Sequence, residues 1–524
     1  MGKIQVEFLS YIMIIYQLKN NPLCILFCVV ILNLMTTTCK HQTEVSPGIF
    51  DPGTDVGNPE LKGISIYDAE TGEYTLTGAG ENIWFDADEF HFLCTKVEGD
   101  FILQARARFI GEDTNPHRKL GIMIRDSLSS ESAHVSAVVH GDGLTSLQYR
   151  NKAGDNTEEI KSTTEGADII QLERKGDTYI FSSAVDGETF TSIEVTRPEI
   201  EGKAHAGIFI CSHEADVMET AVFYNVRLVI PAPGDFIPYQ DYIGSHIETM
   251  DIKTGKRKIV HSSPLSLQAP NWTRDGNNLV YNSEGKLYSL NLLTSEVNEI
   301  NTGFAVNNNN DHVLSFEGKL LGISDHTENP DNQSLIYVLP AEGGTPELIT
   351  SEAPSYLHGF SPDGEYMVYT AGRNNAEHLD IYKISRFSGE EIRLTDAPGL
   401  DDGSEYSPDG RYIYFNSSRT GTMQIWRMKP DGSNQEQMTF DEYNDWFPHV
   451  SPDGKWLAFI SYNSDIRADD HPFYKQVYIR LMPAGGGEPE VIAYLYGGQG
   501  SMNVHNWSPD SRKIAFVSNT KIEE

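Results

Sequence analysis

Short segments of alternating apolar and polar residues, separated by turn residues, fill the chain from residue 47 to residue 230. The clearest are residues 73–76, 101–109, 134–139, 169–173, 179–184 and 221–229. Turn pairs such as Asp142-Gly143 stand between them, and no helical period of useful length occurs. An alternation with a period of two residues is typical of strands with one buried face. The pattern therefore predicts an antiparallel sandwich or jelly roll over residues 47–230.

From residue 241 to residue 524 the alternation is organised into a repeat. Ser-Pro-Asp turns begin at Ser361, Ser407, Ser451 and Ser508, and two degenerate copies begin at Thr273 and Ser315. The spacing of about 42 to 57 residues is typical of four-stranded propeller blades. Pro fixes φ, Asp caps the turn and Gly takes the left-handed position, so we interpret these aspartates as structural rather than catalytic.

The two ends of this repeat region complement each other. Six turns are present, but only one strand pattern, residues 513–518, follows the last of them. A hairpin pattern, residues 246–251 and 256–260, precedes the first turn. We therefore predict a six-bladed ring in which this hairpin completes the last blade and removes the exposed edges.

Residues 1–39 read as a leader and residues 231–240 as a Pro-rich linker between two domains. The apolar run at residues 23–34 is too short to span a bilayer comfortably, so it predicts a secretory signal. Residues 36–39, Thr-Thr-Thr-Cys, resemble the lipobox of bacterial lipoproteins, which implies lipidation of Cys39 and membrane contact only through that lipid. A plain signal peptide or an anchor helix is the alternative. Cys94 and Cys211 either form a disulfide or stay as buried free thiols.

Composition and charge limit the classes of function that the chain can have. The chain has 75 Asp and Glu against 40 Lys and Arg, a net charge of −35 and a pI near 4.7, so a nucleic-acid binder is excluded. Hydrophobic residues at 39%, with 45 Gly and 25 Pro, favour an all-β protein. The sequence has no Gly-x-Ser-x-Gly elbow, which argues against a fused peptidase or esterase.

Both predicted domains resemble known families. Residues 89–92, 100–106 and 120–126 resemble the concanavalin A-like jelly roll of exported bacterial proteins of carbohydrate metabolism. By residue type its candidate sugar contacts are Trp84, His91, Arg125 and Tyr149. The Ser-Pro-Asp-Gly repeats resemble the TolB-like periplasmic propellers, which implies a cell-envelope location in the periplasm or at the outer membrane.

Alignment of the blades on their turns predicts a polar site on the ring axis. His312, His358 and His505 lie three residues before a turn, and Glu405 and His449 lie two residues before one. Equivalent positions in a closed ring converge, and imidazoles with a carboxylate or amide suit manganese, iron or zinc. The alternative for each histidine is a structural hydrogen bond within its blade.

The arrangement is similar to the oligogalacturonate lyases, propellers that hold a divalent metal with histidines and a glutamine. The similarity implies four metal ligands: His312, His358, His449 and Gln499. The candidate substrate contacts are Glu405, His505, Asp402, Asn444, Asp445 and Arg419. No catalytic residue is assigned. The resulting hypothesis is an exported envelope protein that binds oligosaccharides, with cleavage by a metal-dependent lyase or hydrolase left open. The alternative is a non-catalytic glycan-binding lipoprotein or a TolB-like scaffold for an envelope protein partner.

Overall fold

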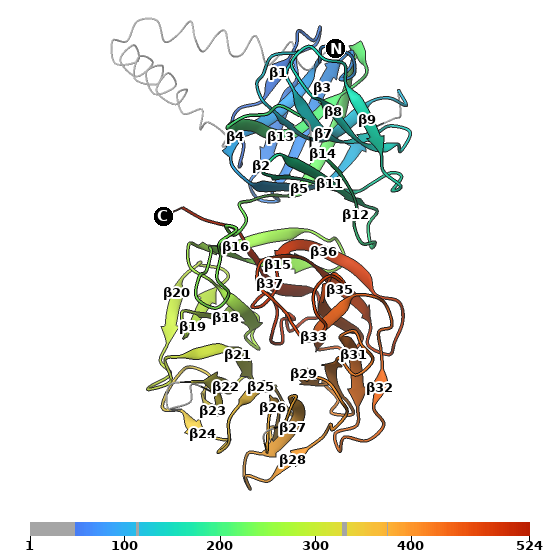
Figure 1. Ribbon diagram of the computed structural model, residues 1–524. Helices are drawn as coiled ribbons and strands as arrows, with labels where there is room; N and C mark the ends of the chain where they lie inside the picture. Colours follow the sequence, from blue (N-terminus) through green and yellow to red (C-terminus); the bar gives the residue numbers. More distant parts are fainter. Residues whose placement is uncertain (1–47, 112–114, 197, 327–332, 375, 524) are drawn as a thin grey trace, which may run out of the picture. The chain divides into compact units, whose positions relative to one another are not determined.

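Regular secondary structure in the described residues consists of strands alone, β1 to β37 (Figure 1). The computed structural model describes residues 48–111, 115–196, 198–326, 333–374 and 376–523. The predicted leader and Cys39 lie outside these ranges. Among the described residues, no helix has the length and apolar character needed to cross a membrane.

The N-terminal strands form two seven-stranded antiparallel sheets. One sheet has the order β1 (Thr54–Val56), β4 (Phe90–Glu98), β13 (Lys203–Cys211), β6 (Lys119–Arg125), β7 (His134–His140), β8 (Thr145–Arg150) and β9 (Glu158–Lys161). The other has the order β12 (Thr191–Val195), β11 (Thr178–Ala184), β10 (Ile169–Lys175), β5 (Phe101–Ile110), β14 (Glu214–Val229), β3 (Glu73–Gly80) and β2 (Ile64–Asp68). Leu103 and Leu172 of the second sheet share one buried core with Ile122 and Val135 of the first. The alternating segments therefore pack as two layers, and their assignment to the concanavalin A-like family stays a prediction.

Polar residues of this sandwich are engaged internally. His91 Nδ1 lies 2.7 Å from Asp55 Oδ1, and the Tyr149 hydroxyl donates to Glu158 at 2.8 Å. Arg125 is fully buried and pairs with Asp88 at 3.3 Å. Three of the four candidate sugar contacts thus already have partners within the fold. Cys94 and Cys211 are buried free thiols, the second of the two alternatives for this pair.

The C-terminal strands form the predicted six-bladed ring, with five four-stranded sheets and one closing sheet (Figure 1). The first blade contains β17 (Gln268–Trp272), β18 (Asn278–Ser283), β19 (Lys286–Asn291) and β20 (Val297–Ile300), and the second contains β21 (Asn308–Leu314), β22 (Leu320–Asp325), β23 (Leu335–Pro340) and β24 (Glu347–Leu348). The third contains β25 (Ser355–Phe360), β26 (Tyr366–Ala371), β27 (Asp380–Ser385) and β28 (Glu391–Arg393), and the fourth contains β29 (Asp401–Tyr406), β30 (Ile413–Ser417), β31 (Gln424–Met428) and β32 (Glu436–Gln437). The fifth contains β33 (Asn444–Val450), β34 (Trp456–Tyr462), β35 (Lys475–Pro483) and β36 (Glu490–Gly497).

The sixth blade joins the two ends of the repeat region, as predicted. Its sheet has the order β16 (Arg257–Ser263), β15 (Ser245–Asp251) and β37 (Lys513–Asn519). Glu248 of β15 is fully buried and accepts hydrogen bonds from Arg257 Nη2 at 2.6 Å and from the Ser518 hydroxyl at 2.6 Å. One buried carboxylate therefore ties the strand before the repeats to the strand after them.

The turn chemistry is also confirmed. The first residue of each Asp-containing turn donates its hydroxyl to the turn aspartate, as Ser407 does to Asp409 at 2.8 Å and Ser451 does to Asp453 at 2.7 Å. In Asp409 and Asp453 burial is the largest single effect and raises the pKa, but the turn hydrogen bonds together with Arg411 and Lys455 outweigh it, so the net pKa lies below the ordinary value. The aspartate carboxylates are hydrogen-bonded within the turns, so they take no part in the site at the ring axis described below.

Candidate functional site at the ring axis

The first strand of every four-stranded blade has an irregular register near its middle. In β17, β25, β29 and β33 the irregularity falls two or three residues before the end of the strand, and β21 has one in the equivalent segment. Left-handed backbone accompanies three of the bulges, at Ala269, Gly403 and Phe447. A bulge re-aims the side chains beside it. Residues at two different offsets from the turn can therefore face the same space, which strict alternation along a strand forbids.

A cavity at the turn end of these strands is lined both by residues two positions before a turn and by residues three positions before one. It has a volume of about 280 Å³ and is lined by residues from all six blades. Asn271 and Glu405, two residues before their turns, line it together with His358 and His505, three residues before theirs. The alignment of the blades on their turns thus predicted three residues of one cavity, Glu405, His358 and His505.

Glu405 lines this cavity and contacts two histidines. Its Oε2 lies 2.7 Å from His449 Nδ1, and its Oε1 lies 3.1 Å from His505 Nδ1. The same Oε1 accepts the backbone N–H of Val450 at 3.0 Å. Burial opposes ionisation, but the two histidines outweigh it and lower the pKa of Glu405 to about 2. Glu405 is therefore a buried carboxylate that holds blades five and six to blade four.

His449 and His505 differ in what remains available. His449 Nε2 lies 2.8 Å from the Met502 carbonyl oxygen, so both ring nitrogens of His449 face oxygen acceptors. Neither ring nitrogen of His449 is therefore free to bind a ligand. His505 keeps 29% of its side chain exposed and lines the cavity. His505 is the histidine of this pair that can contact a bound molecule.

A second histidine–carboxylate contact reaches the same cavity through His358. His358 Nε2 is 2.9 Å from Asp402 Oδ1, which also accepts the Thr370 hydroxyl at 2.6 Å. Burial lowers the pKa of His358, but Asp402 and then Asp311 outweigh it, so the net shift is upward. Burial raises the pKa of Asp311 to about 6. His358 therefore reaches the cavity as the partner of the Asp402 carboxylate rather than as an unpaired imidazole.

The second position of each turn lines the mouth of the cavity. Pro408, Pro452 and Pro509 occupy that position in three regular turns, and Arg274 and Phe316 occupy it in the two degenerate ones. Sequence reasoning did not select Arg274 and Phe316. The departure from Ser-Pro-Asp-Gly was the available signal, because those turns replace an inert proline with a cation and an aromatic ring.

The other predicted site residues lie elsewhere. The buried His312 has Nε2 at 3.3 Å from the Val280 carbonyl oxygen, and burial lowers the pKa of His312 to about 4. Gln499 accepts a hydrogen bond from Asn503 Nδ2 and lines a different cavity, at the start of the inner strands. The remaining three residues make internal contacts. They are Asn444 with Met423 N and the Ile466 carbonyl, Asp445 with Ser461 and Arg480, and Arg419 with Asp401 and Gln435.

The four predicted metal ligands therefore do not form one coordination site in this arrangement. His312 faces a backbone carbonyl, His449 has both nitrogens engaged, and Gln499 lies at the other end of the ring. Across the described part of the chain, no group of three or more His, Cys, Asp or Glu side chains is placed to hold a metal ion. The physical reason is that the imidazoles are directed at separate partners within the fold: His449 engages both ring nitrogens, and His312 and His358 each direct Nε2 at a different oxygen acceptor.

Comparison with known proteins concerns about half of the chain. The TolB beta propeller domain family matches residues 353–470. An uncharacterized protein of Agrobacterium fabrum is 48% identical over 280 residues, which are 53% of this chain and 94% of that protein. A solved structure from Agrobacterium tumefaciens, a candidate TolB, is 47% identical with a TM-score of 0.51, over 54% of this chain and 100% of that one. The Tol-Pal system protein TolB of Francisella tularensis is 26% identical over 216 residues, 40% of this chain and 48% of that protein.

Proposed function

Because the chain belongs to the family of TolB-like six-bladed β-propellers, we propose that it is an exported cell-envelope binding protein. Its ring takes up a protruding segment of a partner protein at the turn-side cavity. The observation that carries this proposal is the composition of that cavity, which combines histidines hydrogen-bonded to carboxylates with an aromatic and cationic mouth.

The mouth defines the kind of segment that fits. Trp272 and Phe316 offer apolar and aromatic contact area, and the exposed Arg274 makes no ion pair among the described residues. Aromatic and arginine side chains dominate protein recognition sites because they bury large areas or donate charged hydrogen bonds. A partner segment with an apolar side chain next to a carboxylate satisfies both groups.

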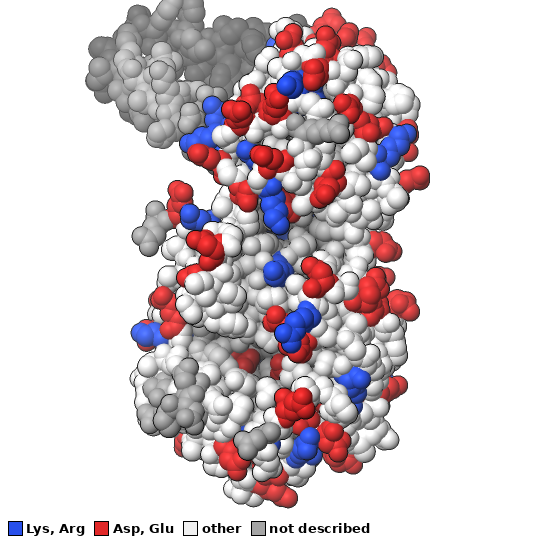
Figure 2. All heavy atoms as spheres, viewed as in Figure 1, with Lys and Arg blue, Asp and Glu red and all other residues white. Residues whose placement is uncertain are grey.

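The engaged histidines favour binding over metal-dependent cleavage. A lyase or hydrolase of that type needs imidazole lone pairs directed at one point, and the histidines nearest the axis are hydrogen-bonded to Glu405, Asp402 and a carbonyl. The acidic surface supports the same choice, since red side chains outnumber blue ones over the face in Figure 2. Such a surface repels long polyuronates.

The location and anchoring are part of the proposal. The leader at residues 1–39 directs export, and a lipid on Cys39 holds the mature chain at a membrane. The name of the Francisella relative, a Tol-Pal system protein, supports an envelope partner. The two-sheet unit serves as a concanavalin A-like jelly roll whose polar residues stabilise its own fold.

Photo-crosslinking tests the cavity mouth. A photoreactive phenylalanine at position 316, in cells that express the full chain, is expected to give a defined partner adduct. The same probe at Phe387, which is 77% exposed and outside the cavity lining, serves as control. Arg274→Ala should weaken the adduct at position 316 about tenfold, the effect of one charged hydrogen bond. Equal adducts at both positions, or an adduct that ignores Arg274→Ala, would refute the proposal.

A further inference from the structure

A second cavity lies at the opposite end of the inner strands from the turn-side cavity. Its volume is about 690 Å³, within the range of small-molecule sites. Gln268 begins β17 and Asn308 begins β21, whereas the turn-side cavity is lined by residues at the ends of those strands. The two cavities are therefore separate candidates with separate chemistry.

Aromatic rings form one wall of this second cavity. Tyr239 and Tyr242 are 59% and 46% exposed. Both stand edge-on to the buried Phe473, with ring centroids 5.4 and 5.6 Å away. Tyr239 has a φ of 63°, a conformation that is costly for a bulky residue and that clusters at binding sites. The fold thus holds two aromatic rings against Phe473 while leaving much of their surface to solvent.

Amide side chains form the other wall, in an unusual concentration. They are Gln268, Asn282, Asn307, Asn308, Asn309, Asn310 and Gln499. Asn282 Nδ2 donates to the carbonyls of Asn308 and Asn309 at 3.0 and 2.9 Å, which fixes the backbone of the asparagine run. The asparagine run enters strand β21 from Asn308 onward. These amides are therefore positioned by a strand.

Two polar groups of this wall lack protein partners within the described residues. The Asn308 Oδ1 atom is buried without a hydrogen bond. Gln499 Oε1 accepts from Asn503 Nδ2 at 3.0 Å, and the Gln499 amide NH₂ makes no hydrogen bond in the described part of the chain. Buried polar groups are normally paired, so the open Asn308 acceptor points to a bound polar molecule, and the Gln499 NH₂ is a further donor that is free at the same cavity.

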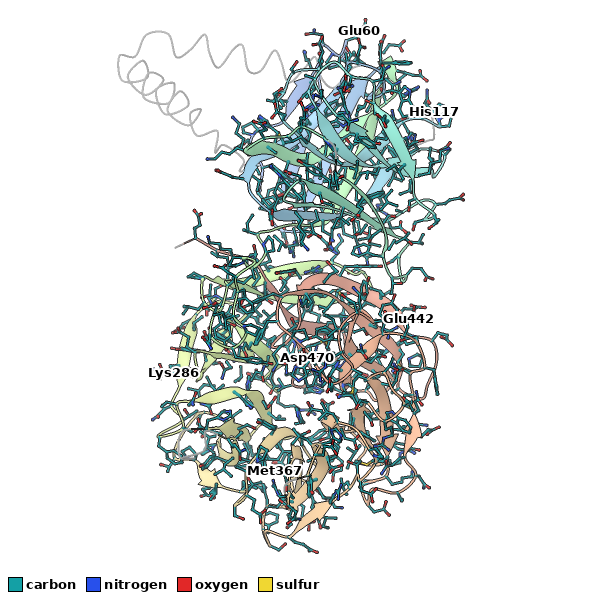
Figure 3. The ribbon with its side chains drawn as sticks, in the orientation of Figure 1. Glu60, His117, Lys286, Met367, Glu442 and Asp470 are labelled. Atoms are coloured by element: carbon teal, nitrogen blue, oxygen red, sulfur yellow. The ribbon has the colours of Figure 1, made fainter. Side chains whose placement is uncertain are left out.

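The charge of the lining limits what that molecule is. The lining contains no Lys or Arg among its described residues, and its one carboxylate is Glu284. A loop that carries Asp470, labelled near the middle of the ring in Figure 3, adds a negative charge that acts on Tyr239. An anionic sugar would find no Lys or Arg to pair with here. Hydroxyl groups suit amides, which both donate and accept, and sugar C–H faces suit tyrosine rings.

We propose that this cavity binds a neutral oligosaccharide, stacked on Tyr239 and Tyr242 and hydrogen-bonded by Asn308 Oδ1 and the Gln499 amide NH₂. The site is independent of the protein-binding cavity at the turn end. It adds a glycan contact to the ring itself rather than to the two-sheet unit.

Calorimetric titration of the full chain tests the site. The probes are neutral hexasaccharides of α-1,4-glucose, β-1,3-glucose, β-1,4-xylose and β-1,4-mannose, with trigalacturonate as the anionic comparison. At least one neutral probe should bind at millimolar concentration or below, and more tightly than trigalacturonate. Tyr242→Ala and Gln499→Ala should each weaken that binding about tenfold, the effect of one lost ring contact or hydrogen-bonding group in a desolvated site.

Three controls make the result specific. Tyr242→Phe keeps the ring and should bind nearly as well as the natural chain. Phe387→Ala removes an exposed aromatic ring outside the cavity lining, and Arg274→Ala alters the turn-side cavity, so neither should change the sugar affinity. The proposal is overturned if no neutral probe binds at millimolar concentration, if trigalacturonate binds best, or if Tyr242→Ala and Gln499→Ala both leave the affinity unchanged.

Discussion

Replacement of Glu405 by glutamine tests whether Glu405, His449 and His505 form a locked ionic network. The pKa of Glu405 falls from its ordinary value of 4.5 to about 2 in the folded chain, because His505 and His449 outweigh the effect of burial. At about 1.4 kcal/mol per pKa unit, this lowering corresponds to about 3.5 kcal/mol of stability at pH 7. Loss of one member of a buried charged pair costs a similar amount, about 3 to 5 kcal/mol.

The lowered pKa of Glu405 also fixes how the folding stability should change with pH. A carboxyl with a depressed pKa stabilises the fold above its unfolded pKa and loses that contribution as the pH falls toward the folded pKa. The difference between the natural chain and Glu405→Gln should therefore be largest near pH 7 and shrink between about pH 4.5 and pH 2.

Urea unfolding followed by tryptophan fluorescence measures this difference, because Trp507 Nε1 donates to the His449 carbonyl. Glu436→Gln is the matched control, since Glu436 lies in the same blade but is 57% exposed and pairs with Arg427 at the surface. Its effect should stay within about 0.5 kcal/mol. A loss below about 1 kcal/mol for Glu405→Gln at pH 7, or a loss that does not change with pH, would refute the locked network.

Two further predictions follow from the axial histidines. Burial lowers the pKa of His312 from 6.5 to about 4, so as the pH falls the imidazole is protonated in the unfolded chain before it is protonated in the folded chain. The natural chain should therefore lose up to about 3 kcal/mol of folding stability as the pH falls from 6.5 to 4. His312→Gln should lack this part of the acid sensitivity, which urea unfolding at pH 7 and pH 5 measures, and an identical pH slope in both proteins would contradict the reasoning. Plasma mass spectrometry of the purified chain should find no stoichiometric manganese, iron or zinc, whereas near-stoichiometric metal that His312→Ala and His358→Ala both abolish would restore the metal site.

The ring was predictable because its signals are local. Each Ser-Pro-Asp-Gly turn carries its own geometry, and the hydroxyl of Ser407 or Ser451 bonds to the aspartate two residues later. The closing sheet was predictable by counting, since strand β37 had no partners unless β15 and β16 supplied them. The family of the two-sheet unit was harder to identify, because alternation fixes which face of a strand is buried but not the order of the strands.

The axial site was predictable only in part, for a reason that lies in the bulges. Counting back from the turns selected Glu405, His358 and His505, which line one cavity. The same count selected His312, whose imidazole instead meets the Val280 carbonyl of the neighbouring blade. The irregular register of β21 spans more residues than those of the other inner strands. A residue three positions before the turn in β21 therefore does not face the cavity as His358 of β25 does. Without coordinates, a pattern of strict alternation cannot reveal where such a bulge falls.

Within a turn of the repeat, the first and third positions hold the turn together, whereas the second position lines the cavity. This explains why the regular repeat in the sequence did not reveal the residues at the mouth of the cavity. In the five turns that contain an aspartate, the first-position hydroxyl and the third-position carboxylate are hydrogen-bonded to each other, so both groups are engaged in holding the turn. The second position makes no such bond and lines the axis, so it is free to change chemistry from blade to blade. Arg274 and Phe316 are the two places where it has changed in this lining. In a repeat ring, then, the deviations from the repeat at a position that the turn does not need are the residues to test first for binding.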